Sequence, residues 1–489
     1  MTEQAKRILA DFQVRKSFAG KRAFRAWLRA QLEGAGYTVT EERGLFSGTN
    51  LIAGETEGAR VLFTAHYDTC AVLPIPNFIT PRSLGWYLLY QLAIVAVFLL
   101  AVAAGFVLLL TSFFGGEGKF ETLLKSFVRE RDVMAFVDGA ESAVNQDLDR
   151  EHWFIQLYGG VQRLSGRRIV EDAVSENTVA KLSNGALNFV NMGTHVWVGP
   201  QTTENAANTA AFARELEELG IPYLYLCAPQ KLQRGVQLLP APLAESGNAS
   251  ADAFLEELDR QGTDYLDLRP LFENNGIYSS WFFKTDHHWK PEAAFFAWQE
   301  LAGVLEDCYG FRTSPGLTNP ANWSTQVLED FFLGSQGKRV GSLYAGVDDI
   351  TLYTPKFDTN LTYACEAYGF SRTGPFETSV CFPERVAERD WFNGNPYTYY
   401  SGGDYPIATI TNHNNPDGPR IVMLRDSFAC ALAPFLSLSC SELITIDLRH
   451  FDGDLMETIG AYDPDLVFTL YTASTTGLEN MFQFDKTEG

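Results

Sequence analysis

The sequence predicts an α/β protein in which a parallel sheet carries helices on both faces, giving three layers. One transmembrane helix and a smaller α/β module precede this sheet. Helical and buried-strand patterns alternate from about residue 188 to the C-terminus, which is typical of parallel sheets. Residues 86–114 are a run of 29 residues without charge, long enough to cross a bilayer as a helix. The formal charge is also divided, with +3 on residues 1–82 and −25 on the remainder, so the two parts are expected in different surroundings.

The chain opens with one helical pattern and two strand patterns. Apolar residues recur at helical spacing over residues 3–34. Residues 50–53 and 60–65 are short apolar runs typical of strands. These elements predict that residues 1–82 are the start of an α/β domain.

A histidine and an aspartate end the second of these strands. His66 and Asp68 form a His-x-Asp pair of residue types that zinc accepts as ligands. Together with residues 50–52, the stretch 63–69 (FTAHYDT) resembles the N-terminus of zinc aminopeptidases of the bacterial leucine aminopeptidase type. That family needs further carboxylates and a second histidine, and this chain instead enters the uncharged run. We therefore interpret residues 1–82 as a truncated zinc-peptidase-like module in which His66 and Asp68 are vestigial, or at most weak metal contacts.

Residues 83–116 are predicted to form a single transmembrane helix. Trp86, Tyr87 and Tyr90 lie at one end of the uncharged run, as interfacial aromatic residues do. A helix buried in a protein core is the alternative interpretation. The basic first part favours a cytoplasmic N-terminus, so we expect a single-pass protein of the cell membrane whose C-terminal domain is extracytoplasmic. Residues 117–187 follow as a mostly helical, polar spacer.

The domain predicted over residues 188–489 supplies the sheet. Its helices have apolar residues at helical spacing, and its strands are short apolar runs that suit a buried parallel sheet. The helices are predicted at residues 203–219, 253–260, 291–307 and from 429, and the strands at 221–227, 265–268, 420–424, 442–446 and 466–470. In such sheets, ligands bind beyond the carboxyl ends of the strands.

Residues 310–419 interrupt this alternation. They are rich in Gly, Pro, Thr and aromatic residues, among them Tyr344, Tyr363 and Tyr397, and they have no helical period. We predict a large insertion of loops and short strands. Exposed aromatic side chains stack on sugar rings and would form a polysaccharide groove, but packing within the fold is the commoner use of such residues.

Composition narrows the classes of function. The net charge of −22 excludes nucleic-acid binding, which needs a basic face. The seven cysteines lack metal-type spacing, and no cofactor is expected. Cys365 and Cys381 are close enough in sequence for a disulfide, although unpaired thiols are the favoured interpretation.

Two separated stretches carry residues suited to catalysis. Asp286 and His288 lie in an Asp-His-His-Trp motif, where the carboxylate can fix the imidazole tautomer. Ser427 follows the strand pattern at 420–424 and precedes a helix, so backbone N–H groups at that turn suit an oxyanion. An N-cap role for Ser427 is the alternative. We predict Ser427 as nucleophile, His288 as base and Asp286 as the acid that orients the imidazole.

Three further residues are weaker candidates for contacts with substrate or an oxyanion. Asn412 lies in an Asn-rich stretch that turn chemistry explains equally well. His287 binds substrate or supports the loop next to His288, and Arg425 lies two residues before Ser427.

The two catalytic stretches together resemble a known group. Residues 285–289 match the signature of the bacterial DHHW proteins, and residues 425–429, 434–436 and 446–449 resemble the serine block of that group. These proteins are relatives of the SGNH-type acyltransferases and esterases, which include the alginate acetylation proteins. The resemblance covers about residues 120–489. One departure is Arg425, which stands where the common Gly-Asp-Ser block has glycine.

The resemblance implies an SGNH-like fold and a serine-dependent O-acetyltransferase or acetylesterase. Such an enzyme would act on a cell-envelope polysaccharide through an acyl-serine, with a membrane-bound acyltransferase as a partner. Transfer and hydrolysis use the same triad, so the sequence does not separate them. Two alternatives from other classes stay open: a zinc-dependent aminopeptidase built on residues 1–82, and a non-catalytic glycan-binding anchor.

Overall fold

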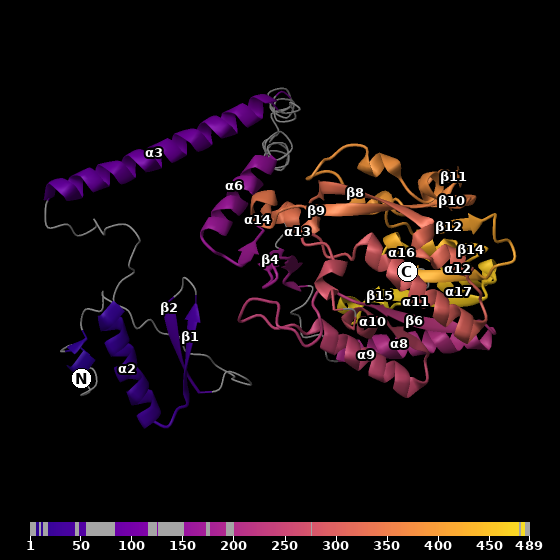
Figure 1. The fold of residues 1–489 in the computed structure, drawn as a ribbon, viewed down its shortest axis with the longest axis horizontal. Coiled ribbons are helices and arrows are strands. Elements are labelled where there is room, and N and C mark those ends of the chain that lie inside the picture. Colours follow the sequence, from indigo (N-terminus) through magenta and orange to yellow (C-terminus); the bar gives the residue numbers. More distant parts are fainter. Residues whose placement is uncertain are drawn as a thin grey trace. The chain divides into compact units, whose positions relative to one another are not determined.

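The computed structural model describes residues 6–8, 11–12, 18–44, 48–54, 84–115, 125, 151–172, 177–191, 200–274, 276–478 and 481–484. The chain divides into two compact units, Met1–Asp149 and Arg150–Gly489 (Figure 1). The strand predicted at 60–65, with His66 and Asp68, lies outside the described residues.

In the first unit, one helix packs against a hairpin. Helix α2 (Phe18–Gly34) is followed by the antiparallel strands β1 (Val39–Gly44) and β2 (Gly48–Ala53). Phe24 and Val39 are buried, and the Arg29 guanidinium donates to the carbonyl of Val39 at 3.0 Å. The strand predicted at 50–53 is confirmed, and the helix predicted at 3–34 is found as α2 over Phe18–Gly34. β1 escaped prediction because its sequence VTEERG has a single large apolar residue.

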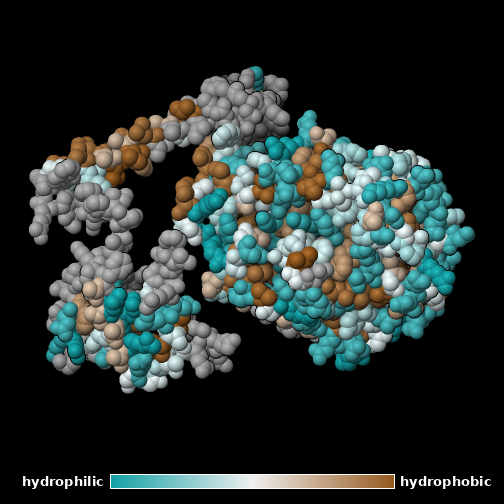
Figure 2. All heavy atoms as spheres, in the orientation of Figure 1, coloured by the Kyte–Doolittle hydropathy of each residue, from teal (hydrophilic) through white to brown (hydrophobic). Residues whose placement is uncertain are grey.

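The uncharged run forms helix α3 (Leu84–Gly115). Its Leu92, Phe98 and Leu100 side chains are exposed, and Figure 2 shows hydrophobic atoms along much of its length. Judged on the residues that the structure describes, no helix is long and apolar enough to cross a membrane. The helix predicted here is therefore confirmed as a helix, and its role in spanning a membrane stays a prediction.

An eight-stranded sheet forms the centre of the second unit, in the order β11-β10-β12-β14-β13-β15-β6-β7. The strands β14, β13, β15, β6 and β7 run parallel to one another, and β12, β10 and β11 pair antiparallel. The bounds are β6 (Tyr223–Ala228), β7 (Tyr265–Asp267), β10 (Leu361–Cys365), β11 (Phe370–Gly374), β12 (Ile407–Asn412), β13 (Arg420–Arg425), β14 (Glu442–Ile446) and β15 (Leu466–Thr472).

Helices cover both faces of this sheet, as predicted. The apolar run of β13 alternates, with Ile421 and Met423 facing one layer and Val422 and Leu424 facing the other. The first layer contains α11 (Pro291–Tyr309) and α16 (Ala429–Ser437). The second contains α8 (Pro200–Glu218), α9 (Gly247–Gln261) and α17 (Leu455–Tyr462).

The prediction of a purely parallel sheet is wrong at one side. The insertion at 310–419 contributes β10, β11 and β12 to the main sheet and adds the hairpin of β8 (Trp323–Phe332) and β9 (Asp348–Pro355). The strand β12 alternates between half-buried and buried residues, as an antiparallel strand with one freer face does. Tyr344, Tyr363 and Tyr397 are buried, so these aromatic residues pack within the fold.

The structure also differs from the prediction of a mostly helical spacer at residues 117–187. Helix α6 (Glu151–Leu164) agrees with it, but β3 (Ile169–Glu171), β4 (Thr178–Lys181) and β5 (Leu187–Phe189) form a small antiparallel sheet. Val170, Val179 and Leu187 from these strands pack with Val340 and Tyr344. The strands are short and were hidden by the polar residues between them.

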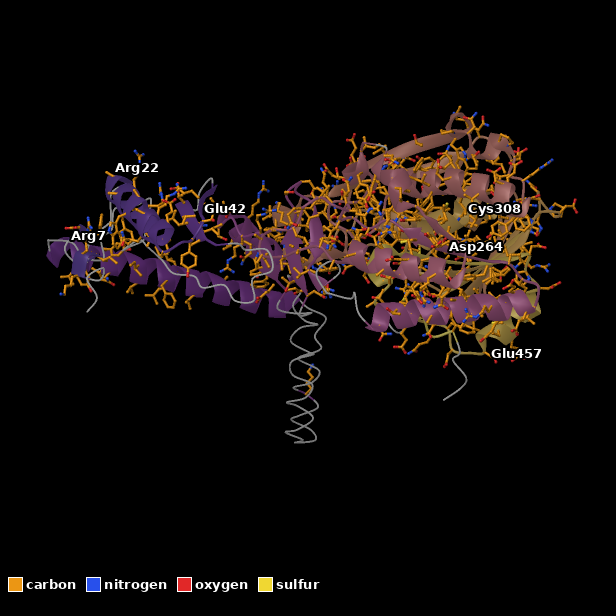
Figure 3. The ribbon with its side chains drawn as sticks, turned by 90° about the horizontal axis from the view of Figure 1, so that it is seen from below. Arg7, Arg22, Glu42, Asp264, Cys308 and Glu457 are labelled. Atoms are coloured by element: carbon orange, nitrogen blue, oxygen red, sulfur yellow. The ribbon has the colours of Figure 1, made fainter. Side chains whose placement is uncertain are left out.

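Short helices join the larger elements. They are α10 (Arg269–Glu273), α12 (Pro315–Thr318), α13 (Ser335–Val340), α14 (Ser342–Ala345), α15 (Phe376–Ser379) and the 3-10 segments η1 (Tyr278–Trp281), η2 (Pro320–Asn322), η3 (Glu366–Tyr368), η4 (Pro383–Val386), η5 (Pro396–Tyr399) and η6 (Ala473–Thr475). Cys365 and Cys381 are unpaired and buried, in agreement with the favoured interpretation. Cys308, near the end of α11, is exposed (Figure 3).

Candidate active site

Ser427 lies directly beyond the carboxyl end of β13, and the side chain of its neighbour holds the turn. One carboxylate oxygen of Asp426 accepts from the backbone N–H of Phe428 at 2.9 Å. The other accepts from the N–H of Thr472, at the end of the neighbouring β15, also at 2.9 Å. The carboxylate of Asp426 is therefore turned away from Ser427 and fixes the turn to the adjacent strand.

Asp286 and His288 lie on the loop between η1 and α11. This loop closes on itself, because the N–H of Phe283 donates to the carbonyl of His288 at 3.2 Å. Pro291 then begins α11 at a position where its missing N–H costs nothing. The indole N–H of Trp289 donates to the carbonyl of Phe428 at 2.9 Å. Trp289 thus ties the histidine loop to the serine turn.

The structure brings the three predicted catalytic residues into one hydrogen-bonded chain. Nε2 of His288 is 2.7 Å from Oγ of Ser427, and Nδ1 of His288 is 2.6 Å from Oδ1 of Asp286. Asp286 is only 3% exposed and His288 9%, whereas Ser427 is half-buried. This arrangement allows His288 to take the hydroxyl proton while Asp286 holds the imidazole N–H.

Residues of the insertion enclose Asp286. The N–H of Ser335 donates to Oδ2 of Asp286 at 2.6 Å. Burial alone would raise the pKa of Asp286, but the adjacent His287 and His288 and these hydrogen bonds hold it well below its usual range. Gly334 approaches so closely that a β-carbon there would lie 2.2 Å from Cβ of Asp286. The site therefore keeps an ionised carboxylate in a space that admits only glycine.

A second buried carboxylate fixes the backbone before Asp286. Asp348 accepts from the N–H groups of Lys284 and Thr285 at 2.8 and 2.7 Å, and from the Thr285 hydroxyl at 2.7 Å. Lys231 donates to the carbonyl of Leu187 at 2.6 Å and lies 3.4 Å from that of Lys284. Burial lowers the pKa of Lys231 to about 7. These contacts hold the loop on both sides of its backbone.

Tyr397, on η5, supports both catalytic loops. Its ring stacks on the His288 imidazole with centroids 4.1 Å apart and an angle of 19°. Its hydroxyl donates to the carbonyls of Ser427 and Phe428 at 3.2 and 3.1 Å. One side chain thus limits the rotation of the base and the movement of the nucleophile's turn.

His287 lies beside the triad but outside it. Its Nδ1 is 3.1 Å from the Ser335 hydroxyl and 3.6 Å from the Asp286 carboxylate. Burial, followed by the neighbouring His288, lowers the pKa of His287 to about 3. A neutral imidazole at this place supports the loop through Ser335, and its contact with a substrate stays a prediction.

Among the residues that the structure describes, two groups have metal-type donor atoms within 4.8 Å of one another. They are Asp286 with His287 and His288, and Asp404 with Asp447 and His450. In the first group the catalytic hydrogen bonds already use Asp286 and both nitrogens of His288. In the second, arginine guanidinium groups already bind both carboxylates. The proposed mechanism uses neither group as a metal site.

The structure does not bring Asn412 or Arg425 to the nucleophile's hydroxyl. Asn412 ends β12, which is antiparallel to β14, so it lies at the opposite edge of the sheet from Ser427. Its amide donates to the carbonyls of Ser437 and Leu438 at 3.2 and 3.3 Å. The guanidinium of Arg425 is buried against Asp404 and the carbonyl of Gly403. An oxyanion role for either side chain is therefore set aside.

The backbone supplies a better donor for an oxyanion. Within the part of the chain that the structure describes, nothing accepts from the N–H of Ser427. A free amide on the nucleophile itself is the kind of donor that stabilises the negative charge developing during acyl transfer.

Three supporting residues were missed by the sequence reasoning: Asp348, Ser335 and Tyr397. They come from the insertion, where no periodic pattern exists. The Gly-rich stretch 334–337 is the only local signal that the backbone makes a close approach there.

One family model matches part of this chain. Residues 194–328 match the model of the family described as "SGNH hydrolase-like domain, acetyltransferase AlgX". The SGNH hydrolase-like resemblance is confirmed. The match includes Asp286 and His288 and ends before Ser427, so the place of the serine in the site rests on the geometry.

Two solved structures of Bacillus cereus PatB1 support the fold. Bacillus cereus PatB1 has 22% identity and a TM-score of 0.52, over 63% of this chain and 100% of that protein. PatB1 with a sulfonyl adduct has 21% identity and a TM-score of 0.51, over 65% and 100%. A DHHW family protein from Eubacterium siraeum DSM 15702 has 19% identity and a TM-score of 0.48, over 62% and 93%. No curated protein matches this chain.

Proposed function

We propose that this chain is a membrane-anchored, extracytoplasmic acyl-ester enzyme. It moves acetyl groups to or from a cell-envelope polysaccharide through an acyl-serine on Ser427. The observation that carries the proposal is the continuous chain from Ser427 Oγ through His288 to Asp286, with contacts of 2.7 and 2.6 Å. The SGNH hydrolase-like match over residues 194–328 supports acyl transfer as the class of reaction.

In the first half-reaction, Oγ of Ser427 attacks the carbonyl carbon of an acetyl donor while His288 takes the hydroxyl proton. The N–H of Ser427 stabilises the oxyanion of the tetrahedral intermediate. As the bond to the donor breaks, the imidazolium returns its proton to the leaving group. Asp286 stabilises the positive charge on His288 throughout, because its own pKa lies well below the usual range.

In the second half-reaction, a hydroxyl group attacks the acetyl-serine while His288 takes its proton. The bond between the acetyl carbon and Oγ then breaks, and the imidazolium returns the proton to Ser427. A sugar hydroxyl gives O-acetyl transfer, and water gives hydrolysis. Both outcomes use the same residues, so we propose either transferase or esterase activity. A membrane-bound acyltransferase is the proposed source of acetyl groups. The apolar α3 and the charge division between residues 1–82 and the remainder support membrane anchoring with the acidic part outside.

Substitution of the triad tests this proposal. We expect Ser427→Ala and His288→Ala each to lower hydrolysis of a soluble acetyl ester by roughly three or more orders of magnitude. The double variant should be little worse than either, since triad members act as a unit. Ser324→Ala, an exposed serine on β8, is the matched control and should behave as the wild type.

Mass spectrometry should find the acetyl group on the peptide that contains Ser427 when turnover is slowed. Wild-type rates in Ser427→Ala would overturn the proposed mechanism and favour the non-catalytic glycan-binding alternative.

A further inference from the structure

Helix α6 carries a stripe of large apolar side chains that the fold leaves exposed. Trp153, Leu157, Val161 and Leu164 are 66%, 51%, 61% and 90% exposed. At the helical period these positions fall within about 80° of arc, so they form one face. In Figure 2, hydrophobic atoms gather where Figure 1 places α6.

Other residues of α6 pack against α13 and α14. A β-carbon at Gly159 would lie 1.7 Å from the carbonyl oxygen of Val340, so the helix backbone touches α13 there. The amide of Gln156 donates to the Ser342 hydroxyl at 2.8 Å. Leu343, 52% exposed, lies beside Gly160 and extends the apolar stripe. The stripe is therefore held rigidly outward and is not free to turn into the core.

Positive charge accompanies the stripe. Residues 150–489 carry 23 Lys/Arg and 44 Asp/Glu, a formal charge of −21. Residues 152–170 nevertheless contain Arg163, Arg167 and Arg168 and no acidic residue. All three arginines are exposed, and Arg163 is anchored by a 3.0 Å bond to the carbonyl of Leu343, next to the stripe. A basic rim around an apolar stripe stands out against the acidic surface of the unit.

We propose that α6 lies on the surface of an anionic membrane. The stripe enters the boundary between headgroups and acyl chains, and the arginines bind the lipid phosphates. Trp153 is of the residue type that prefers this boundary. An acidic protein partner would satisfy the arginines, but a single flat stripe with basic flanks on an exposed helix suits a lipid surface better. In the chain, α6 is also the first described helix after the apolar α3.

This proposal goes beyond the proposed enzymatic function and does not depend on the triad. A membrane-surface helix would hold the catalytic unit with a fixed face toward the bilayer, in addition to the anchoring proposed for α3.

Residues 150–489 allow a test without α3, because all four clusters of buried residues draw on this unit alone. The fragment should sediment with vesicles of phosphatidylcholine and phosphatidylglycerol, and less with phosphatidylcholine alone. Added salt should weaken binding, since the arginine contacts are screened. Absence of sedimentation with anionic vesicles would overturn the proposal.

Matched variants separate the stripe from general surface effects. Leu157→Glu with Val161→Glu should reduce vesicle binding at least about tenfold, because burying one such side chain is worth that factor or more. Leu219→Glu with Ile277→Glu, of similar exposure and on other elements, should leave binding unchanged. Equal binding by the two double variants would overturn the proposal. So would a dimer of the fragment that only the α6 variant breaks, since a second copy would then be the occupant.

A second measurement uses the full chain in bilayer discs containing a photoactivatable phosphatidylglycerol. We expect cross-links on the peptide spanning α6 as well as on α3, and loss of the α6 cross-links in the Leu157→Glu, Val161→Glu variant. Cross-links confined to α3 in the wild type would refute the proposal even if the fragment failed to fold.

Discussion

Replacing Gly334 by alanine tests whether the position of Asp286 controls the reaction. The φ angle of Gly334 is −73°, so alanine fits the backbone. The added β-carbon would nevertheless lie 2.2 Å from Cβ of Asp286 and 2.7 Å from its Cα. Carbon atoms pack at about 3.5 Å or more, so Asp286 or residue 334 must move by roughly 1 Å. One of the atoms in conflict belongs to the backbone, so no side-chain rotation relieves it.

The expected result is a loss of activity in a protein that remains folded. A displacement of about 1 Å in a catalytic group can cost roughly a hundredfold in rate. Overpacking of this kind costs about 1–3 kcal/mol of folding free energy, which a domain of ordinary stability survives. We therefore expect kcat/KM for a soluble acetyl ester to fall by roughly a hundredfold in a protein that remains folded, measured well below its Tm.

Gly303→Ala is the matched control, because nothing lies within 4 Å of a β-carbon there and Gly303 is inside α11. It should keep full activity and gain slightly in stability, since alanine is the better helix former. Wild-type kcat/KM in Gly334→Ala would refute the argument that the close approach of Gly334 fixes Asp286. If both variants lost kcat/KM to the same extent, the argument would be refuted as well.

Two further predictions concern acid stability and topology. Burial would raise the pKa of Asp404, but Arg425 and Arg449 outweigh it and lower the pKa from 3.8 to about 2. A carboxylate with a lowered pKa stabilises the fold fully above its ordinary pKa and loses this effect as pH falls. Asp404→Asn should thus cost about 2 kcal/mol at neutral pH in urea unfolding, and the deficit should shrink between about pH 4 and pH 2; a constant deficit would contradict this. Protease added to intact cells should remove the part after α3, and complete protection until lysis would exclude the proposed extracytoplasmic placement.

The parallel strands β6, β13, β14 and β15 were predictable because apolar residues make up most of each short run. The prediction for β14 agrees at both ends with Glu442–Ile446, and the one for β13 stops one residue short of Arg425. The antiparallel strands were missed because β10 and β12 are only five and six residues long and mix Thr, Ala or Asn with larger apolar residues. Such short mixed stretches also occur in loops, and it is the pairing of β10 with β12 and of β12 with β14 that makes them strands.

The site residues also divide into those that a local sequence pattern predicts and those that it does not. The signals for Asp286 and His288 are two residues apart, and Ser427 has the local signal of a strand followed by a helix. Asp348, by contrast, bonds a backbone N–H 63 residues away, which no local pattern records. The prediction for Asn412 failed for a topological reason. Its strand runs opposite to β13 and β14, so the end of β12 is at the edge where those strands begin.

Arg425 shows how a departure from the common Gly-Asp-Ser block is accommodated. It ends β13 at 2% exposure, and a buried guanidinium is tolerated only when paired and hydrogen-bonded. Asp404 supplies the charge, and the carbonyl of Gly403 accepts at 2.7 Å. The same guanidinium donates to the carbonyl of Asp426 at 3.2 Å, one peptide before the nucleophile. Arg425 therefore holds the carbonyl side of the serine turn while the Asp426 carboxylate holds its amide side. Because both sides are fixed, a large residue in place of glycine leaves Ser427 Oγ within 2.7 Å of His288.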